Sequence, residues 1–196
     1  MNGLPLVLAS RSPRRRELLA QLGIEHEVIP ADIDETPRAG EPPGDYVLRI
    51  AREKAEAVCA SLEPARWVLG ADTEVVCDGR IYGKPENAGD AERMLGELAG
   101  RAHHVYSAVA LAGPGGEVSD ALQVSRVRFR ALTPPEIRAY VATGDPLDKA
   151  GAYGVQGRAA AFIEHLEGSY SGVMGLPLFE TSGLLAAAGL PSGLDP

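Results

Sequence analysis

Cysteine, aromatic residues and long apolar runs are all scarce in this sequence of 196 residues. Its two cysteines, Cys59 and Cys77, lack metal-ligand spacing, which argues against a disulfide framework and favours a reducing compartment. No apolar run approaches the roughly 20 residues that span a bilayer. No basic flank precedes a long apolar stretch near the first residue, so no secretory signal is predicted. We therefore expect a cytoplasmic protein without a membrane partner.

An excess of positive charge is also missing, because the formal net charge is −8. Binding along a nucleic acid requires a basic stripe, so we expect no nucleic-acid polymer as a partner. Arginine is nevertheless concentrated at Arg11, Arg14, Arg15 and Arg16. One tight basic spot on an acidic protein suits a small anionic ligand.

What is present is the composition of an ordinary globular protein, with 45% hydrophobic and 23% charged residues. The length allows one domain, or two small lobes that share a core. Strand and helix patterns alternate along the chain, which predicts an α/β fold with a mixed central sheet flanked by helices. We expect one domain over residues 1–190 and a frayed tail over residues 191–196.

Hydrophobic periods and turn residues indicate the individual elements. Strands are expected over residues 4–9, 26–30, 67–77, 80–82, 105–111, 126–131 and 160–166. Helices are expected over residues 13–22, 45–62, 90–98 and 177–188. A short helix should follow Thr133 and Glu136, which have the spacing of a capping box. Asp78-Gly79 should turn a hairpin, and glycine-rich loops are expected over residues 151–157 and 168–172.

The first local inconsistency is the basic start of the helix that follows Ser12. Arginines in a first helical turn oppose the helix dipole, and this penalty reverses if an anion binds there. The hydroxyl groups of Ser10 and Ser12 add donors beside the free backbone N–H groups. Because successive helical residues point about 100° apart, we assign the anion to Arg14 and expect Arg15 and Arg16 to face solvent. The alternative is a solvated basic helix start.

Lys54 lies in the middle of the apolar stripe of the helix expected over residues 45–62. A lysine in that position either extends its ammonium to the rim of the apolar surface or points into a cleft that holds an anion. Periodicity alone favours the extension to the rim. Both interpretations remain open at the level of the sequence.

Asp72 continues the apolar run over residues 67–69. A buried aspartate is costly unless it is paired, hydrogen-bonded or bound to a metal. Asp72 and Glu74 share one strand face, and with Asp34 and Glu35 they could hold a hard cation such as Mg²⁺. The alternative is that Asp72 caps a turn.

Several familiar catalytic motifs are missing. No glycine-rich run ends in the Gly-Lys-Ser or Gly-Lys-Thr of a phosphate-binding P-loop. No Gly-x-Ser-x-Gly joins a strand to a helix, so a serine nucleophile elbow is not predicted. His103 and His104 are adjacent on a strand and therefore face opposite sides, which makes a structural role more plausible than a metal pair.

Seven ordered segments of the chain resemble the Maf family of nucleotide pyrophosphatases. They are LASRSPRR (residues 8–15), IDE (33–35), AREKA (51–55), GADT (70–73), GKP (83–85), KAGAYGVQG (149–157) and GSYSGVMGLP (168–177). The match extends from about residue 6 to residue 185. One departure is Arg101, where many members have lysine; arginine and lysine are not equivalent at a bidentate site.

The resemblance implies a Maf/ITPase-like fold with two lobes around a nucleotide-binding cleft. It also implies hydrolysis between the α and β phosphates of a nucleoside triphosphate, a divalent cation (Mg²⁺ or Mn²⁺) and a homodimer. Asp72 matches the catalytic carboxylate, which we expect to accept the proton of the attacking water. Together with Asp72, Glu35 is expected to hold the metal. The expected substrate-binding residues are Ser10, Arg14, Lys54, Thr73, Lys84 and Gln156.

The expected substrates are dTTP and UTP. Arg14, Thr73 and Gln156 match the positions that sort substrates in the family, and their identities resemble the dTTP/UTP branch. Gln156 and Thr73 would read the base edge, because an amide and a hydroxyl match the hydrogen-bonding pattern of uracil or thymine. Two alternatives stay open: a pyrophosphatase for purine or methylated-GTP substrates, and a nucleotide-binding regulator of septum formation with little catalysis.

Overall fold

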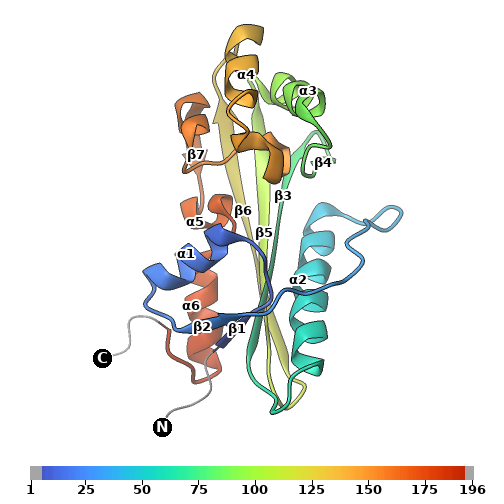
Figure 1. Ribbon diagram of the computed structural model, residues 1–196, viewed down its shortest axis with the longest axis vertical. Helices are drawn as coiled ribbons and strands as arrows, with labels where there is room; N and C mark the ends of the chain where they lie inside the picture. Colours follow the sequence, from blue (N-terminus) through green and yellow to red (C-terminus); the bar gives the residue numbers. More distant parts are fainter. Residues whose placement is uncertain (1–5, 193–196) are drawn as a thin grey trace. The chain divides into compact units, whose positions relative to one another are not determined.

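The computed structural model describes residues 6–192 (Figure 1). Its strands are β1 (Leu6–Leu8), β2 (His26–Val28), β3 (Val68–Cys77), β4 (Arg80–Tyr82), β5 (Ala102–Ala112), β6 (Val118–Phe129) and β7 (Ile163–Glu167). They follow the order β2-β1-β3-β5-β6-β7, and β4 pairs with β3. β1 is parallel to β2 and β3, whereas β4 and β7 are antiparallel to their neighbours. The sheet is therefore mixed, as predicted.

The helices are α1 (Pro13–Gln21), α2 (Pro43–Ala60), α3 (Ala88–Leu98), α4 (Pro134–Val141), α5 (Tyr170–Met174) and α6 (Leu178–Ala187). Three 3₁₀ turns lie between α4 and β7: η1 (Asp145–Asp148), η2 (Ala150–Ala152) and η3 (Arg158–Phe162). Among residues 6–192, no helix combines the length and the apolar content that crossing a bilayer requires. Most of the tail expected over residues 191–196 lies outside the described residues.

The chain forms two compact units. Unit 1 comprises Met1–Asp72, Ser107–Gln123 and Gly175–Pro196, and unit 2 comprises Thr73–Tyr106 and Val124–Met174. The boundaries between these segments fall inside β3, inside β5, inside β6 and just after α5. Each unit therefore contains segments that are far apart in the sequence.

In unit 1, α2 packs directly against β3. A Cβ atom added to Gly70 would lie 2.2 Å from the carbonyl oxygen of Ala51 and 2.8 Å from the backbone nitrogen of Ala55. In Figure 1, α2 runs along one side of the strands of this unit and α6 along the other. The buried face of α2 includes Val47 and Ile50, and it also includes Lys54. This close approach is what brings Lys54 to β3.

Unit 2 has a core of apolar and aromatic side chains. α3 packs against α4, and both helices cover the strands with buried side chains such as Leu95 and Tyr140. Phe129 forms edge-to-face contacts with Phe162 and with Tyr153, at ring-centroid distances of 6.2 and 4.8 Å. The sequence therefore places half of its few aromatic groups in one cluster here.

Two predicted local motifs are confirmed. The side chain of Thr133 accepts a hydrogen bond from the backbone of Glu136, whose carboxylate accepts one from the backbone of Thr133, so the capping box is complete. Asp78 and Gly79 have φ values of 50° and 76°, the left-handed pair that a tight two-residue hairpin requires.

The first half of β6, the short helix α5 and the turns η1, η2 and η3 were not predicted, and η3 occupies residues 160–162 of the strand expected over residues 160–166. The strand expected over residues 126–131 is the second half of β6, whose first half presents exposed or half-buried side chains. Without a buried face that half has no apolar alternation to recognise. A short helix, α5, occupies part of the loop expected over residues 168–172.

Candidate active site

A partly buried cluster of charge in unit 1 joins α2, β3 and the loop between β2 and α2. The ammonium of Lys54 lies 2.9 Å from Oδ1 of Asp72 and 2.7 Å from Oε2 of Glu35. Lys54 is 8% exposed and Asp72 is 5% exposed, whereas half of the Glu35 side chain is exposed. The structure thus brings together three of the predicted site residues, with Asp72 at the buried end and Glu35 at the surface.

This arrangement corrects the interpretation that periodicity favoured for Lys54. Its ammonium does not extend to solvent at the rim of α2, because two carboxylates hold it against β3. Asp72 also does not cap a turn, since it lies within β3. Helical spacing could not reveal these partners, which come from other elements of the fold.

The two carboxylate oxygens of Asp72 differ in their contacts. Oδ2 is buried and has no hydrogen-bond partner within residues 6–192. A buried carboxylate oxygen without a partner is costly, and such exceptions often mark a catalytic or ion-binding role. The Asp72 carboxylate therefore has one oxygen bound to lysine and another available to a ligand or a proton.

The loop that carries Glu35 is held to α2 by its own hydrogen bonds. The hydroxyl of Tyr46 donates to the carbonyl of Glu35 at 2.9 Å. Oδ1 of Asp34 accepts hydrogen bonds from the hydroxyl and the backbone N–H of Thr36, and these bonds lower the pKa of Asp34. Asp34 is thus used in a turn, and Glu35 is the acidic residue of this loop that reaches Lys54.

A second group of residues gathers at the start of α1. Ser10 is buried, and its hydroxyl oxygen accepts hydrogen bonds from the backbone N–H of Ser12 at 3.2 Å and from Nη1 of Arg15 at 3.1 Å. Nε of Arg15 donates to the carbonyl of Gly175 at 2.8 Å. The expectation that Arg15 faces solvent is therefore wrong, whereas Arg16 is exposed as expected and Arg14 is half-buried.

The contacts of Arg15 with Ser10 and Gly175 could not be predicted from the sequence. Helical geometry gives the direction of a side chain around α1, but it cannot show a carbonyl that lies 160 positions away in the chain. Arg15 binds both the hydroxyl of Ser10 and the carbonyl of Gly175, so it holds the loop of Ser10 that leads into α1.

The remaining predicted residues belong to unit 2. Thr73 directly follows Asp72 on β3, and Lys84 is exposed in the loop after β4. The carbonyl of Gly83 accepts a hydrogen bond from the backbone N–H of Gly151 at 3.1 Å. Through this bond, the loop of Lys84 is joined to the glycine-rich loop that ends with the exposed side chain of Gln156.

Arg101, the residue that departs from the family pattern, lies on the surface. Its guanidinium pairs with the carboxylate of Asp78 and also donates to the carbonyl of Glu97. These bonds connect Arg101 to none of the predicted site residues. Arginine at this position instead holds the end of β3 at which the hairpin turns.

Metal binding would depend on Asp72 and Glu35. Within residues 6–192, no three side chains of His, Cys, Asp or Glu gather as a ready metal site. Mg²⁺, however, is commonly held by one or two carboxylates and completes its shell with water and phosphate oxygens. The carboxylates of Asp72 and Glu35, which converge on the ammonium of Lys54, fit that donor set.

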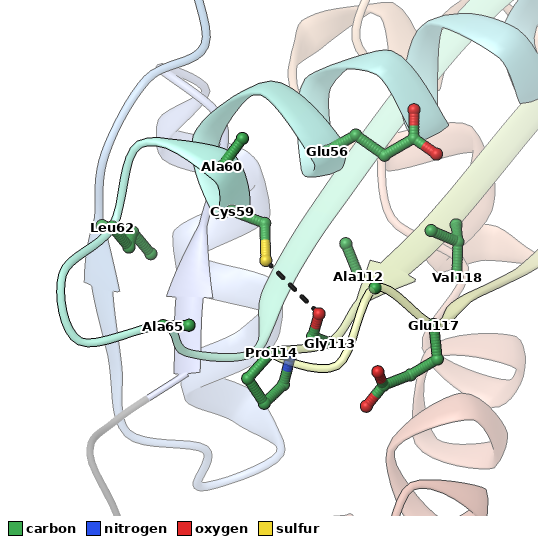
Figure 2. A pocket seen from close by; sticks show the side chains of 11 residues that line it. Glu56, Cys59, Ala60, Leu62, Ala65, Ala112, Gly113, Pro114, Glu117 and Val118 are labelled. Carbon is green, nitrogen blue, oxygen red and sulfur yellow. Dashed lines mark hydrogen bonds between the residues drawn. The ribbon is translucent and has the colours of Figure 1, made fainter.

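A separate pocket of about 380 Å³ lies in unit 1, at the C-terminal end of α2 (Figure 2). Its lining includes Cys59, Glu56 and Glu117, but none of the predicted site residues. The thiol of Cys59 donates to the carbonyl of Gly113 at 3.5 Å, and burial followed by the charge of Glu117 raises its pKa. A thiol held in its protonated form is a poor nucleophile, so this pocket does not compete with Asp72.

Comparison with known proteins identifies similar sequences over nearly the whole chain. A family model described as Maf-like protein matches residues 5–188. Proteins named dTTP/UTP pyrophosphatase from Aromatoleum aromaticum and Nitrosomonas europaea are each 53% identical to this chain. The first alignment covers 95% of this chain and 96% of the relative, and the second covers 94% and 95%.

The structure of the Staphylococcus aureus Ham1 protein is similar to this chain with a TM-score of 0.50. The two are 16% identical, and the match covers 93% of this chain and 96% of that chain. At that identity the likeness concerns the fold, and it confirms the predicted α/β class.

Proposed function

The chain belongs to the Maf family, and we propose that it hydrolyses dTTP and UTP to the nucleoside monophosphate and pyrophosphate. The observation that carries the proposal is the buried Asp72, with Oδ1 on Lys54 and Oδ2 without a hydrogen-bond partner among the described residues 6–192. The relatives that share half of the sequence are named for the same two substrates.

In this proposal Asp72 is the catalytic residue. Its Oδ2 accepts the proton of the water that attacks the triphosphate, as a general base must lie within hydrogen-bond reach of that water. Lys54 fixes the other oxygen of the carboxylate and so holds Asp72 in one orientation. The ammonium of Lys54 would also face the triphosphate. When the substrate binds, the attraction between this ammonium and the phosphates would weaken the ion pair of Lys54 with Glu35.

Ser10, Arg14 and Lys84 would bind the phosphates together with Lys54. Ser10 and Arg14 lie at the start of α1, where free backbone N–H groups and the helix dipole favour an anion. The hydrogen bonds of Arg15 keep Ser10 in place there. Lys84 adds a charged group on a short loop whose backbone is bonded to Gly151.

Glu35 and Asp72 would hold a divalent cation, Mg²⁺ or Mn²⁺. When bound, such a cation neutralises negative charge on the phosphates. The two carboxylates already share one cation, the ammonium of Lys54, which shows that their oxygens converge. Magnesium needs no further protein ligand when water and phosphate oxygens complete its shell.

Thr73 and Gln156 would select the base. The hydroxyl of Thr73 can donate and accept, and the amide of Gln156 offers both a carbonyl and an NH₂ group. Uracil and thymine present two carbonyls around one N–H, whereas cytosine presents an amino group in place of one carbonyl. A site built to satisfy the first pattern leaves polar groups unpaired with the second, which is a strong basis for rejection.

We further propose a cytoplasmic homodimer that binds no nucleic-acid polymer and no membrane. The side chain of Phe179 on α6 is 87% exposed, and a second copy of the chain could cover it. Light scattering on the purified protein measures the mass in solution: a value of twice the chain mass of 20.6 kDa supports the dimer, and a monomer mass contradicts it.

The test of the activity is a panel of nucleotides with Mg²⁺ and separate detection of pyrophosphate and orthophosphate. We expect equal amounts of pyrophosphate and monophosphate from dTTP and UTP, with kcat/KM at least tenfold above that for CTP, ITP or methylated GTP. Preference for a purine nucleotide would replace the substrate assignment. Tight nucleotide binding without pyrophosphate release would overturn the enzymatic function itself.

A further inference from the structure

The glycine-rich loop that carries Gln156 extends over residues 149–157, and we call it the Gln156 loop. Two of its residues have left-handed backbone conformations, Gly151 with φ 66° and Ala152 with φ 59°. A residue other than glycine rarely adopts this conformation, and it persists only where the surroundings hold it. The Gln156 loop is therefore defined by its contacts with the rest of unit 2.

One of these contacts is made by Tyr153, which belongs to the core of unit 2. Its side chain is 5% exposed, and its ring packs edge-to-face against Phe129 and against the imidazole of His103. The hydroxyl of Tyr153 lies 2.8 Å from Nε2 of His103. His103 belongs to β5 and is 1% exposed, so one buried hydrogen bond joins the Gln156 loop to the sheet.

This hydrogen bond is between neutral groups. Burial lowers the pKa of His103 to about 4, with a smaller contribution from the charge of His104. Burial also raises the pKa of Tyr153, and nearby Tyr140 acts in the same direction. Neither group changes its charge near neutral pH, and neither takes part in the proposed hydrolysis.

Stability alone does not account for this polar pair. Nδ1 of His103 is buried and has no hydrogen-bond partner among residues 6–192. An unsatisfied buried polar atom costs free energy, and an apolar pair of similar shape would avoid that cost. What the pair provides is a fixed position for Tyr153, because a hydrogen bond is directional and apolar packing is not.

Gly154 connects Tyr153 to the part of the loop that holds Gln156. A Cβ atom added to Gly154 would lie 2.8 Å from Cε of Lys149 and 3.2 Å from Oε1 of Gln156. The amide of Gln156 thus lies close to the backbone that immediately follows Tyr153.

We propose that His103 and Tyr153 are positioning residues that set the place of the Gln156 amide and thereby the choice between uracil and cytosine. The proposal rests on the proposed function, in which Gln156 reads the base. His103 and Tyr153 act through the backbone of the Gln156 loop and do not touch the substrate.

The test compares UTP with CTP, which differ only in the base, using kcat and KM measured separately. Tyr153→Phe removes the hydroxyl and keeps the ring, and His103→Leu removes the imidazole nitrogens. Each variant should lower the UTP/CTP ratio of kcat/KM about tenfold, mainly through a higher KM for UTP. The double variant should lose no more than either single variant, because both remove the same hydrogen bond.

Two further variants separate positioning from a general loss of stability. His103→Gln offers an amide near the position of Nε2 and should keep the ratio within about twofold of the unmodified chain. Val127→Ala truncates a buried residue of β6 and should lower the melting temperature without changing the ratio.

The outcomes are distinct. If the unmodified chain does not discriminate UTP from CTP, the proposed function fails. If it discriminates and Tyr153→Phe does so equally, the positioning proposal alone is overturned. If His103→Leu does not fold, the positioning proposal is still tested by Tyr153→Phe and His103→Gln, because both variants keep the volume of the core.

Discussion

The Asp72 carboxylate is the single group on which the proposed chemistry depends, and Asp72→Asn tests it. The amide keeps the shape of the side chain, so the fold should persist, but it cannot accept a proton. We expect kcat for dTTP to fall by about 10²- to 10⁴-fold, measured as pyrophosphate release, with an unchanged circular dichroism spectrum. Asp120→Asn is the matched control, since that carboxylate pairs with Arg52 in the same unit and has no assigned catalytic role. Near-normal turnover of Asp72→Asn would refute the assignment.

Lys54 should contribute to stability as well as to catalysis. Lys54→Met keeps the apolar stem and removes the charge that balances the buried Asp72. Breaking a buried ion pair from one side costs about 3 kcal/mol, because the other charge is left uncompensated. Urea unfolding measures this loss of unfolding free energy.

The matched control for Lys54 is Lys84→Met, at an exposed lysine, for which we expect a change within about 0.5 kcal/mol. In an Asp72→Asn background, the cost of Lys54→Met should shrink, since the charge that it balances is gone. An equal cost in both backgrounds would contradict the pairing.

Single residues show where sequence reasoning reaches its limit. Asp72 and Lys54 are visible in the sequence, because each is a charged group in an apolar pattern. Their contact is not visible, because it depends on how closely α2 approaches β3. The direction of Arg15 could not be predicted for the same reason, since its partner Gly175 becomes a neighbour only in the folded unit.

At the scale of elements, the packing of α2 on β3 predicts that Gly70→Ala destabilises the protein. Gly70→Ala would force a Cβ atom against backbone atoms of Ala51 and Ala55, which cannot rotate away. We expect a loss of about 1–3 kcal/mol or more, together with reduced activity as Lys54 moves with α2. Thermal and urea unfolding measure the loss.

Gly96→Ala on α3 is the control, because a Cβ atom there meets nothing within 4 Å. Alanine is the better helix former, so this variant should gain about 0.5–1 kcal/mol. A Gly70→Ala protein as stable as the unmodified chain would mean that α2 can move away from β3 without cost.

Elements with a buried face were predictable, and elements without one were not. The apolar stripe of α2 and the buried run of β3 both gave their elements within a few residues of the observed bounds. The first half of β6 has no continuous buried face, so it lacked the alternation that marks a strand. The Gln156 loop was recognised by its glycines, but its anchor Tyr153 was not, because aromatic packing depends on tertiary contacts.

For the molecule as a whole, His103 predicts how stability depends on pH. The folded chain keeps the ring neutral down to a pKa of about 4, whereas the unfolded chain takes up a proton below the ordinary value of 6.5. The unfolded state therefore binds more protons between these values, and the free energy of unfolding falls as the pH drops through this window. The loss should reach about 2 kcal/mol between pH 7 and pH 5.

Urea unfolding at pH 7, 6 and 5 measures this slope, and His103→Gln should remove most of it. Glu41 and Glu136, whose pKa values are lowered to about 2 mainly by Arg49 and Arg130, lose their contributions only below the ordinary value of 4.5. The stability that these two carboxylates contribute is therefore lost at a more acidic pH than the stability linked to His103. An unchanged slope in His103→Gln would assign the pH dependence to another group.

The division of the chain between its units has a consequence for synthesis on the ribosome. Unit 1 begins with the first strand and is completed only by the segment Gly175–Pro196, whereas unit 2 ends at Met174. During synthesis, all of unit 2 is therefore made before α6, the last helix of the unit that contains β1 and α2. Translation that stops before residue 175 would leave the apolar faces of Asp72's own unit uncovered, which makes truncated products natural clients for chaperones and proteases.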